Sequence, residues 1–280
     1  MTTLTRARTR TKTPTAAKPT VICVFGTPGA GRSTLAVNVA AELAVTQKSV
    51  LLIDADTQNP SLATLLGIPE HPVGLAALAR SVRSGTMSIS EIQRQSKELE
   101  VAKRVFGFIP GMPSRHRWAE VTPSAMQSII QIAKTEYEYV VLDLPPLLGN
   151  ELERPESPLK RDALTNWLIE NADALLVLAE ADPISIGRLV NLETSLNRAP
   201  SNSRIIINRF RTTALGPSAK LQIRDTVQTL MKRKVDHFLP DDPKATDNAL
   251  ARGGTLHSSR AKSPLRKAIT KLVRELTARN

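Results

Sequence analysis

The stretch Val21-Ile-Cys-Val-Phe-Gly-Thr-Pro-Gly-Ala-Gly-Arg-Ser-Thr34 joins an apolar run to a glycine-rich loop. From Gly26 to Ser33 it matches the phosphate-binding pattern G-x-x-x-x-G-K-[ST], except that Arg32 stands in place of lysine. The run 21–25 predicts a strand, and 33–46 predicts a helix with one apolar stripe. A glycine loop between a strand and a helix wraps phosphate with its amide groups, at the positive end of the helix.

We therefore predict that this loop binds the phosphates of a nucleotide. The predicted phosphate-binding residues are Gly26, Thr27, Pro28, Gly29, Ala30, Gly31, Arg32, Ser33 and Thr34. Arg32 carries a planar fork where the pattern has a compact ammonium, and Pro28 has no N–H to donate. The alternative is a glycine turn that joins strand to helix without any ligand.

Acidic residues follow two other apolar runs. Asp54 and Asp56 come directly after 51–53, and Asp143 follows 140–142. The carboxyl ends of parallel strands converge on one crevice, so we expect these carboxylates beside the glycine loop. Mg²⁺ prefers oxygen ligands. The predicted metal residues are Ser33, Asp56 and Asp143, and the predicted catalytic residues are Asp56, which orients water, and Arg32. The alternative for each Asp is a cap on a helix or turn.

Apolar runs alternate with helical patterns along the chain. Further strands are predicted at 49–53, 107–110, 139–142, 174–179 and 204–207, with helices at 121–134 and 264–280 and loops at 111–121 and 147–162. This alternation predicts an α/β fold of the P-loop type, with a mostly parallel, doubly wound sheet flanked by helices. We expect one nucleotide-binding domain over 20–280, preceded by a disordered basic tail over 1–19.

Composition limits the location and the partners. The chain of 280 residues carries a formal net charge of +12, which favours nucleic acid or an anionic membrane as partners. The single Cys23 excludes an intrachain disulfide and fits a reducing compartment. No apolar stretch reaches the roughly 20 residues that span a bilayer, and no signal peptide is recognisable. We expect a cytoplasmic protein, with the inner face of the plasma membrane as an alternative location.

Taken together, these motifs resemble the ParA/MinD branch of P-loop ATPases, over roughly residues 20–280. The stretch 54–62 looks like the branch's second motif, and 143–146 looks like its Mg²⁺-side motif. The end of the predicted strand 204–207 resembles its adenine-contacting strand end, and the stretch 240–242 resembles its second base-contacting turn, which implies roles for Asn208, Arg209, Pro240 and Asp241. The stretches 239–253 and 263–269 resemble actinobacterial CpaE/TadZ-like and septum-site-determining-like proteins.

The resemblance implies ATP or ADP with Mg²⁺, a homodimer, and a protein partner in positioning or secretion machinery, for pilus assembly or for division and partition. In this family a signature lysine lies near the start of the loop, where Thr27 stands here. Because Arg32 replaces the second lysine, we expect at most a weak ATPase that forms ADP and phosphate. A bacterial tyrosine kinase also shares motifs, but its C-terminal tyrosine cluster has no counterpart, since the only tyrosines are Tyr137 and Tyr139.

Three functions therefore remain open: a slow ATPase switch that dimerises with ATP, a non-hydrolysing nucleotide-binding scaffold, and a partition ATPase that binds DNA nonspecifically. Two further segments also have two interpretations. The basic amphipathic helix 264–280 is either a membrane-surface anchor or a helix packed on the sheet, and the pattern favours packing because the stripe lacks Trp and Phe. Residues 115–118 are either a nucleic-acid or partner contact, or a solvated loop.

Overall fold

The computed structural model describes residues 18–68, 74–147, 161–212 and 216–278. Of the predicted tail 1–19 only the last two residues are described, and most of the predicted loop 147–162 lies outside the described ranges. The strands are β1 Thr20–Gly26, β2 Val50–Asp54, β3 Lys97–Val101, β4 Arg104–Ile109, β5 Tyr139–Asp143, β6 Ala174–Glu180, β7 Ser203–Phe210 and β8 Val235–Pro240.

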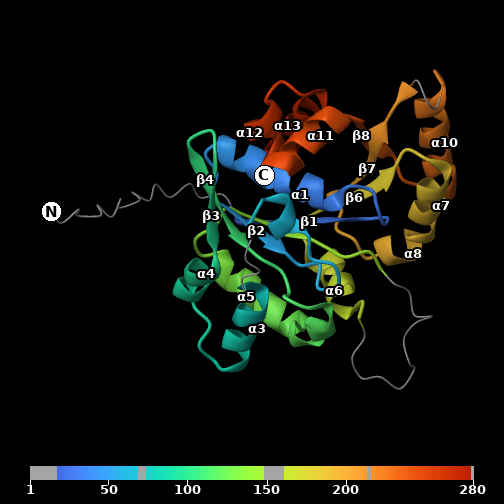
Figure 1. The fold of residues 1–280 in the computed structure, drawn as a ribbon. Coiled ribbons are helices and arrows are strands. Elements are labelled where there is room, and N and C mark those ends of the chain that lie inside the picture. Colours follow the sequence, from blue (N-terminus) through green and yellow to red (C-terminus); the bar gives the residue numbers. More distant parts are fainter. Residues whose placement is uncertain (1–17, 69–73, 148–160, 213–215, 279–280) are drawn as a thin grey trace.

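The helices enclose this sheet (Figure 1). They are α1 Arg32–Val45, α2 Leu62–Leu65, α3 Gly74–Arg83, α4 Ile89–Gln95, the 3₁₀ helix η1 Arg115–Glu120, α5 Pro123–Ala133, α6 Ala163–Asn171, α7 Pro183–Asn191, α8 Glu193–Leu196, α10 Ala219–Met231, α11 Pro243–Arg252, α12 Leu256–Arg260 and α13 Pro264–Thr277. None of the helices in the described ranges is long and apolar enough to span a bilayer.

The eight strands form one sheet in the order β3-β4-β2-β5-β1-β6-β7-β8. Every pair is parallel except β3 with β4, so the predicted mostly parallel sheet is confirmed. Successive residues of the central strands face opposite sides of the sheet, as the period of two requires. In β1, Val21, Cys23 and Phe25 enter one buried cluster, and Ile22 and Val24 enter the other.

Both faces of the sheet are covered, which explains the continuous aliphatic runs in its central strands. Helices α1, α11, α12 and α13 lie over one face, and α3, α5 and α6 lie over the other (Figure 1). All strands predicted from apolar runs are present, within a few residues of the predicted bounds. The predicted loop at 111–121 is wrong in part, because it contains the 3₁₀ helix η1.

Two strands were not predicted from the sequence, β3 and β8. The edge strand β3 reads Lys-Glu-Leu-Glu-Val, and its charged residues are exposed. Its hairpin with β4 turns through Ala102 and Lys103, both in the left-handed region at φ 49° and 61°. Two-residue hairpin turns with two positive φ angles usually contain Asn-Gly, so the Ala-Lys pair does not predict a hairpin. Charges along an exposed edge oppose pairing with other chains.

The C-terminal helix α13 packs on the sheet, in agreement with the favoured interpretation of its pattern. Its apolar stripe is buried, and the stripe consists of Leu265, Ile269, Leu272, Val273 and Leu276. These side chains join the cluster that α1 also enters. The stripe is therefore not available to insert into a membrane while the helix stays in place.

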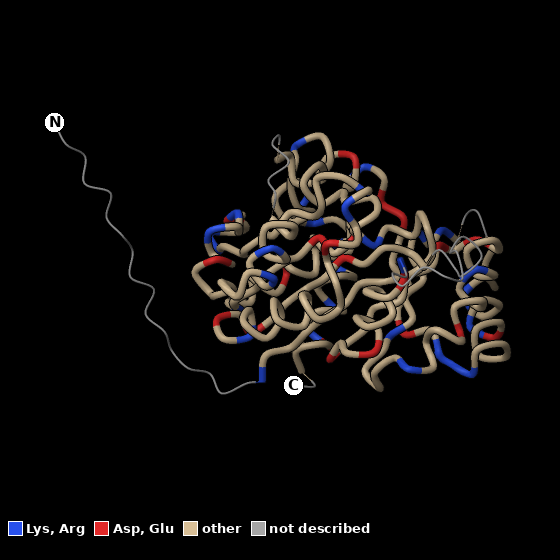
Figure 2. Tube along the Cα trace, turned by 90° about the horizontal axis from the view of Figure 1, so that it is seen from below, with Lys and Arg blue, Asp and Glu red and all other residues tan. Residues whose placement is uncertain are grey.

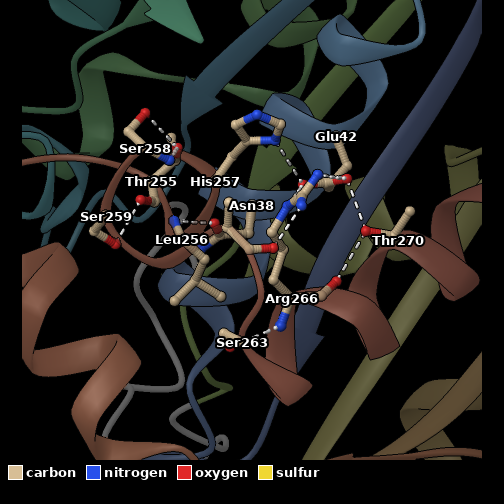
Figure 3. A network of polar contacts seen from close by, with 11 residues as sticks. Asn38, Glu42, Thr255, Leu256, His257, Ser258, Ser259, Ser263, Arg266 and Thr270 are labelled. Atoms are coloured by element: carbon tan, nitrogen blue, oxygen red, sulfur yellow. Dashed lines mark hydrogen bonds and ion pairs between the residues drawn. The ribbon is translucent and has the colours of Figure 1, made fainter. Parts of the chain in front are cut away.

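A buried carboxylate on α1 forms hydrogen bonds that hold α13 in place (Figure 3). The side chain of Glu42 is only 3% exposed and accepts hydrogen bonds from Arg266 Nε at 2.7 Å and Nη2 at 3.2 Å. Thr270 Oγ1 donates to the same carboxylate at 2.8 Å. One turn earlier on α1, Asn38 Oδ1 accepts from the backbone N–H of Leu256 at 2.8 Å. The helix that begins at the glycine loop is thus cross-linked to α12 and α13.

We predict that Glu42→Gln lowers the free energy of unfolding by about 2 kcal/mol, because it weakens charge-assisted hydrogen bonds and leaves the partly buried Arg266 guanidinium without a counter-ion. Urea unfolding monitored by circular dichroism measures this change. The control Glu98→Gln alters an exposed carboxylate on β3 and should change stability by less than about 0.5 kcal/mol. Equal effects of the two variants would show that the Glu42 network contributes nothing specific.

Candidate functional site

The glycine loop begins where β1 meets β6. Gly26 has φ 148°, and a Cβ there would lie 2.0 Å from the backbone oxygen of Leu178. The next residue, Thr27, donates its backbone N–H to the same oxygen at 2.9 Å. No side chain fits in this contact, so only glycine can start the loop at this position.

The loop ends at the first turn of α1. Gly31, at φ 86°, precedes the helix, and no side chain caps the helix start. By contrast, α5, α7, α11 and α13 each begin at a Ser, Thr or Asp whose side chain accepts a backbone N–H. The first N–H groups of an α-helix have no partner within the helix. Those of α1 are therefore available to an anion, as the motif predicts.

Asn208 at the end of β7 supports the loop from behind. Its Nδ2 donates to the backbone oxygen of Ala30 at 2.7 Å. A Cβ at Gly31 would lie 2.6 Å from that same nitrogen. The contact between Asn208 and the base of a nucleotide that the resemblance implies stays a prediction, and in the structure the Asn208 amide also supports the loop itself.

Thr27 is turned inward. It is buried, and its Oγ1 lies 2.7 Å from Ser185 Oγ. Ser185 also accepts the backbone N–H of Glu180 at 2.8 Å, so this pair joins the loop to the junction of β6 and α7. Thr27 stands where the ParA/MinD-type proteins that the sequence resembles have a signature lysine, and its hydroxyl is bonded inside the chain.

The two carboxylates after β2 shape the following segment. Asp54 Oδ2 accepts the backbone N–H groups of Ser61 and Leu62, each at 3.0 Å. Burial, together with the charge of Asp143, raises the pKa of Asp54 well above its usual range. Asp56 Oδ1 accepts from the backbone of Gln58 at 3.1 Å and Asn59 at 2.8 Å, so this side chain also stabilises a turn.

Asp143 differs from the other two. It pairs in register with Asp54 on β2 and with Val24 on β1, which places it at the centre of the sheet end. Its carboxylate is buried, and neither oxygen accepts a hydrogen bond from the described residues. Burial raises the pKa of Asp143 to about 7, although the nearby Ser33 hydroxyl and the Arg32 guanidinium lower it in part.

Arg32 points toward the carboxylates of Asp56 and Asp143, which we call the acidic side of the site. Its Nη1 donates to the backbone oxygen of Leu144 at 2.8 Å, and its Nη2 lies 3.9 Å from Asp56 Oδ2. Burial lowers the pKa of the guanidinium, and the charges of Asp143 and Asp56 oppose that shift. Ser33 Oγ accepts a hydrogen bond from Ser61 Oγ at 3.0 Å. No sequence motif indicates the contact of Leu144 with Arg32 or that of Ser61 with Ser33.

A pocket of about 90 Å³ lies between the loop and the ends of β7 and β8. Its lining includes the predicted residues Gly31, Thr34, Asn208, Arg209, Pro240 and Asp241. The structure thus brings the predicted phosphate and base residues to one place, although they lie far apart in the sequence. Arg209 has φ 53° and pairs with Glu180 at 3.3 Å, which leaves it exposed at the rim.

The arginine-rich segment of η1 forms contacts of its own. Arg117 pairs with Glu120 one turn later, and Arg161 lies over the Trp118 ring at 5.9 Å from its centre. Residues 115–120 therefore form a 3₁₀ helix with side-chain contacts, where the sequence predicted a solvated loop.

Comparisons with known proteins agree with this geometry. A family model described as an AAA domain matches residues 20–154. The septum site-determining protein MinD of Synechocystis sp. is 24% identical over 228 residues, which cover 80% of this chain and 76% of that protein. The fold is similar to that of a ParA family ATPase from Chlorobium tepidum TLS, with a TM-score of 0.73, 20% identity, and coverage of 91% of this chain and 98% of that one.

A second similar structure is that of a nucleotide complex. The septum site-determining protein MinD from Pyrococcus horikoshii OT3, complexed with Mg-ADP, has a TM-score of 0.69 and 17% identity, and the match covers 92% of this chain and 95% of that one. At this level of identity the likeness extends to the fold.

We predict that Gly31→Ala weakens nucleotide binding by more than about tenfold, because the new Cβ displaces Asn208 from the loop and strains a left-handed residue. Titration with a fluorescent ATP analogue measures the affinity. Gly29→Ala is the matched control, since Gly29 has φ 80° but no neighbouring atom within 4 Å of an added Cβ. If both variants bind equally well, the packing of Asn208 against the loop does not matter for the ligand.

Proposed function

We propose that this chain, a P-loop protein of the ParA/MinD type, binds ATP with Mg²⁺ and acts as a slow ATPase switch. One observation carries the proposal: the uncapped start of α1, the unpartnered carboxylate of Asp143 and the pocket beside the ends of β7 and β8 meet at one end of the sheet. Ligands of open α/β sheets bind at the carboxyl ends of the strands.

The loop would hold the phosphates of the nucleotide. The first backbone N–H groups of α1 donate to phosphate oxygens, and the helix dipole favours their negative charge. The base would enter the pocket beside Asn208 and Pro240. That pocket, at about 90 Å³, is small against the 300–1,000 Å³ typical of complete ligand sites, so it suits one end of a nucleotide.

The residues at the acidic side fit a hydrated Mg²⁺. No described cluster of three His, Cys, Asp or Glu side chains forms a ready-made metal site, so phosphate oxygens would complete the coordination. Ser33 would contribute its hydroxyl, and Asp143 would accept hydrogen bonds from metal-bound water with its unpartnered oxygens. The metal supplies positive charge that stabilises the transferring phosphoryl group.

Asp56 would orient the attacking water. Its Oδ1 is held by two backbone N–H groups, which leaves Oδ2 directed toward Arg32. Thr27 is bonded inside its own chain and lacks the charge to stabilise the reaction across a dimer. We therefore expect slow chemistry, and a non-hydrolysing nucleotide-binding scaffold is the second candidate.

The output of the switch would be a partner's position and not a metabolite. We propose that ATP promotes a face-to-face dimer that recruits a protein of pilus assembly or of division and partition machinery, as the likeness to MinD suggests. Nonspecific DNA binding is a less favoured output. Lys and Arg are interspersed with Asp and Glu across the described part in Figure 2, so the net charge does not point to one groove.

We predict that the full chain hydrolyses bound ATP slowly in a single-turnover assay with Mg²⁺ and protein in excess. Asp56→Asn keeps the oxygen that stabilises the turn but loses the carboxylate, and it should slow the reaction by roughly 10²-fold or more. The control Asp225→Asn alters an exposed residue of α10 and should leave the rate unchanged.

Each outcome has a distinct meaning. ATP that is bound but stays uncleaved by the unmodified chain would favour the scaffold. Cleavage that survives in Asp56→Asn would contradict the role of Asp56. No binding of ATP at all would contradict the nucleotide site itself.

A further inference from the structure

The direction of Arg32 departs from what the phosphate-loop pattern predicts. In that pattern the residue before the Ser or Thr reaches the phosphates. Here the Arg32 side chain is 12% exposed, and both ends of its guanidinium contact groups at the ends of β2 and β5. The Leu144 oxygen lies 2.8 Å from Nη1, and Asp56 Oδ2 lies 3.9 Å from Nη2.

Three buried carboxylates lie at this end of the sheet, and two of them, Asp56 and Asp143, act on Arg32. Asp54 and Asp143 are 1% exposed, and Asp56 is 4% exposed. Among the described residues, Arg32 is the only cation that forms an ion pair with any of them. A desolvated guanidinium is costly unless negative charge and hydrogen bonds offset the loss of water. Here Leu144 supplies the acceptor, and Asp143 and Asp56 supply the charge.

We infer that, in the nucleotide-free protein, Arg32 is a built-in counter-cation for Asp56 and Asp143, which occupies the acidic side of the site in place of a divalent cation and does not serve as a phosphate ligand. The inference rests on the proposed function only for the identity of the metal that it displaces. Free Mg²⁺ then has little affinity for these carboxylates, because Arg32 already offsets part of their charge.

The choice of arginine follows from its geometry. The guanidinium is a planar fork with donors in two directions, so one side chain bonds the Leu144 oxygen and faces Asp56 at the same time. Lysine carries a single ammonium that cannot bridge both positions in this way. The substitution therefore changes which part of the site the residue serves, from the phosphates to the segments that follow β2 and β5.

Thermal unfolding of the nucleotide-free full chain tests this inference, with and without millimolar MgCl₂ at matched ionic strength. We expect the Tm of the unmodified chain to be insensitive to Mg²⁺. In Arg32→Met the Tm should fall by roughly 5–10 °C without Mg²⁺, since the carboxylates lose their counter-charge. Mg²⁺ should restore at least half of that loss.

Arg266→Met is the matched control, because it also removes a partly buried arginine from a buried carboxylate, that of Glu42. Its Tm should fall and stay low with Mg²⁺. If Arg32→Met does not fold without Mg²⁺, Arg32→Lys replaces it and should show a smaller loss that Mg²⁺ again restores.

Two results would overturn the inference. One is a Tm of the unmodified chain that rises with Mg²⁺ as much as that of the variant. The other is a loss in Arg32→Met that Mg²⁺ does not restore, together with ATP binding weakened more than tenfold, which is the behaviour of a phosphate ligand. ATP binding to the unmodified chain is measured separately by equilibrium dialysis. Its absence would contradict the proposed function without deciding the Mg²⁺ response of Tm.

Discussion

The position of strand β5 between β1 and β2 determines the geometry of the whole site. Its register sets Asp143 opposite Val24 on one side and Asp54 on the other. The glycine loop leaves β1 two residues after Val24, and the segment with Asp56 leaves β2 immediately after Asp54. A shift of one residue in this register would turn the carboxylates to the opposite face of the sheet. The loop, the acidic residues and α1 therefore depend on the same backbone hydrogen bonds.

The charged side chains at this end of the sheet are distributed in an unusual way. The site contains three buried carboxylates, and the partly buried Arg32 faces this acidic side instead of the loop. Thr27 stands at the position of the signature lysine of the ParA/MinD-type proteins that the sequence resembles, and it is bonded to Ser185. Phosphate binding would therefore depend on backbone N–H groups and on a metal ion more than on side-chain cations. This distribution favours a protein that holds nucleotide over one that cleaves it rapidly.

The sequence predicted the strands of the sheet better than the side-chain contacts at their ends. Aliphatic runs located β1, β2, β5, β6 and β7, because strands covered on both faces need continuous apolar residues. The edge strand β3 escaped prediction because its residues are mostly charged, and β8 because its sequence Val-Asp-His-Phe-Leu-Pro has no clear period. The contacts of Arg32 with Leu144 and of Asn208 with Ala30 join segments more than 100 residues apart, so no local pattern encodes them.

Photo-crosslinking with 8-azido-ATP, followed by peptide mass spectrometry, tests the location of the nucleotide most directly. We predict that the label attaches at the ends of β7 and β8, near Asn208–Arg209 and Pro240–Asp241, and that excess ATP prevents the labelling. A label confined to another surface, such as the groove between α7 and α10, would contradict it. Labelling at the predicted strand ends that persists in excess ATP would also contradict it, because the pocket would then not be an ATP site.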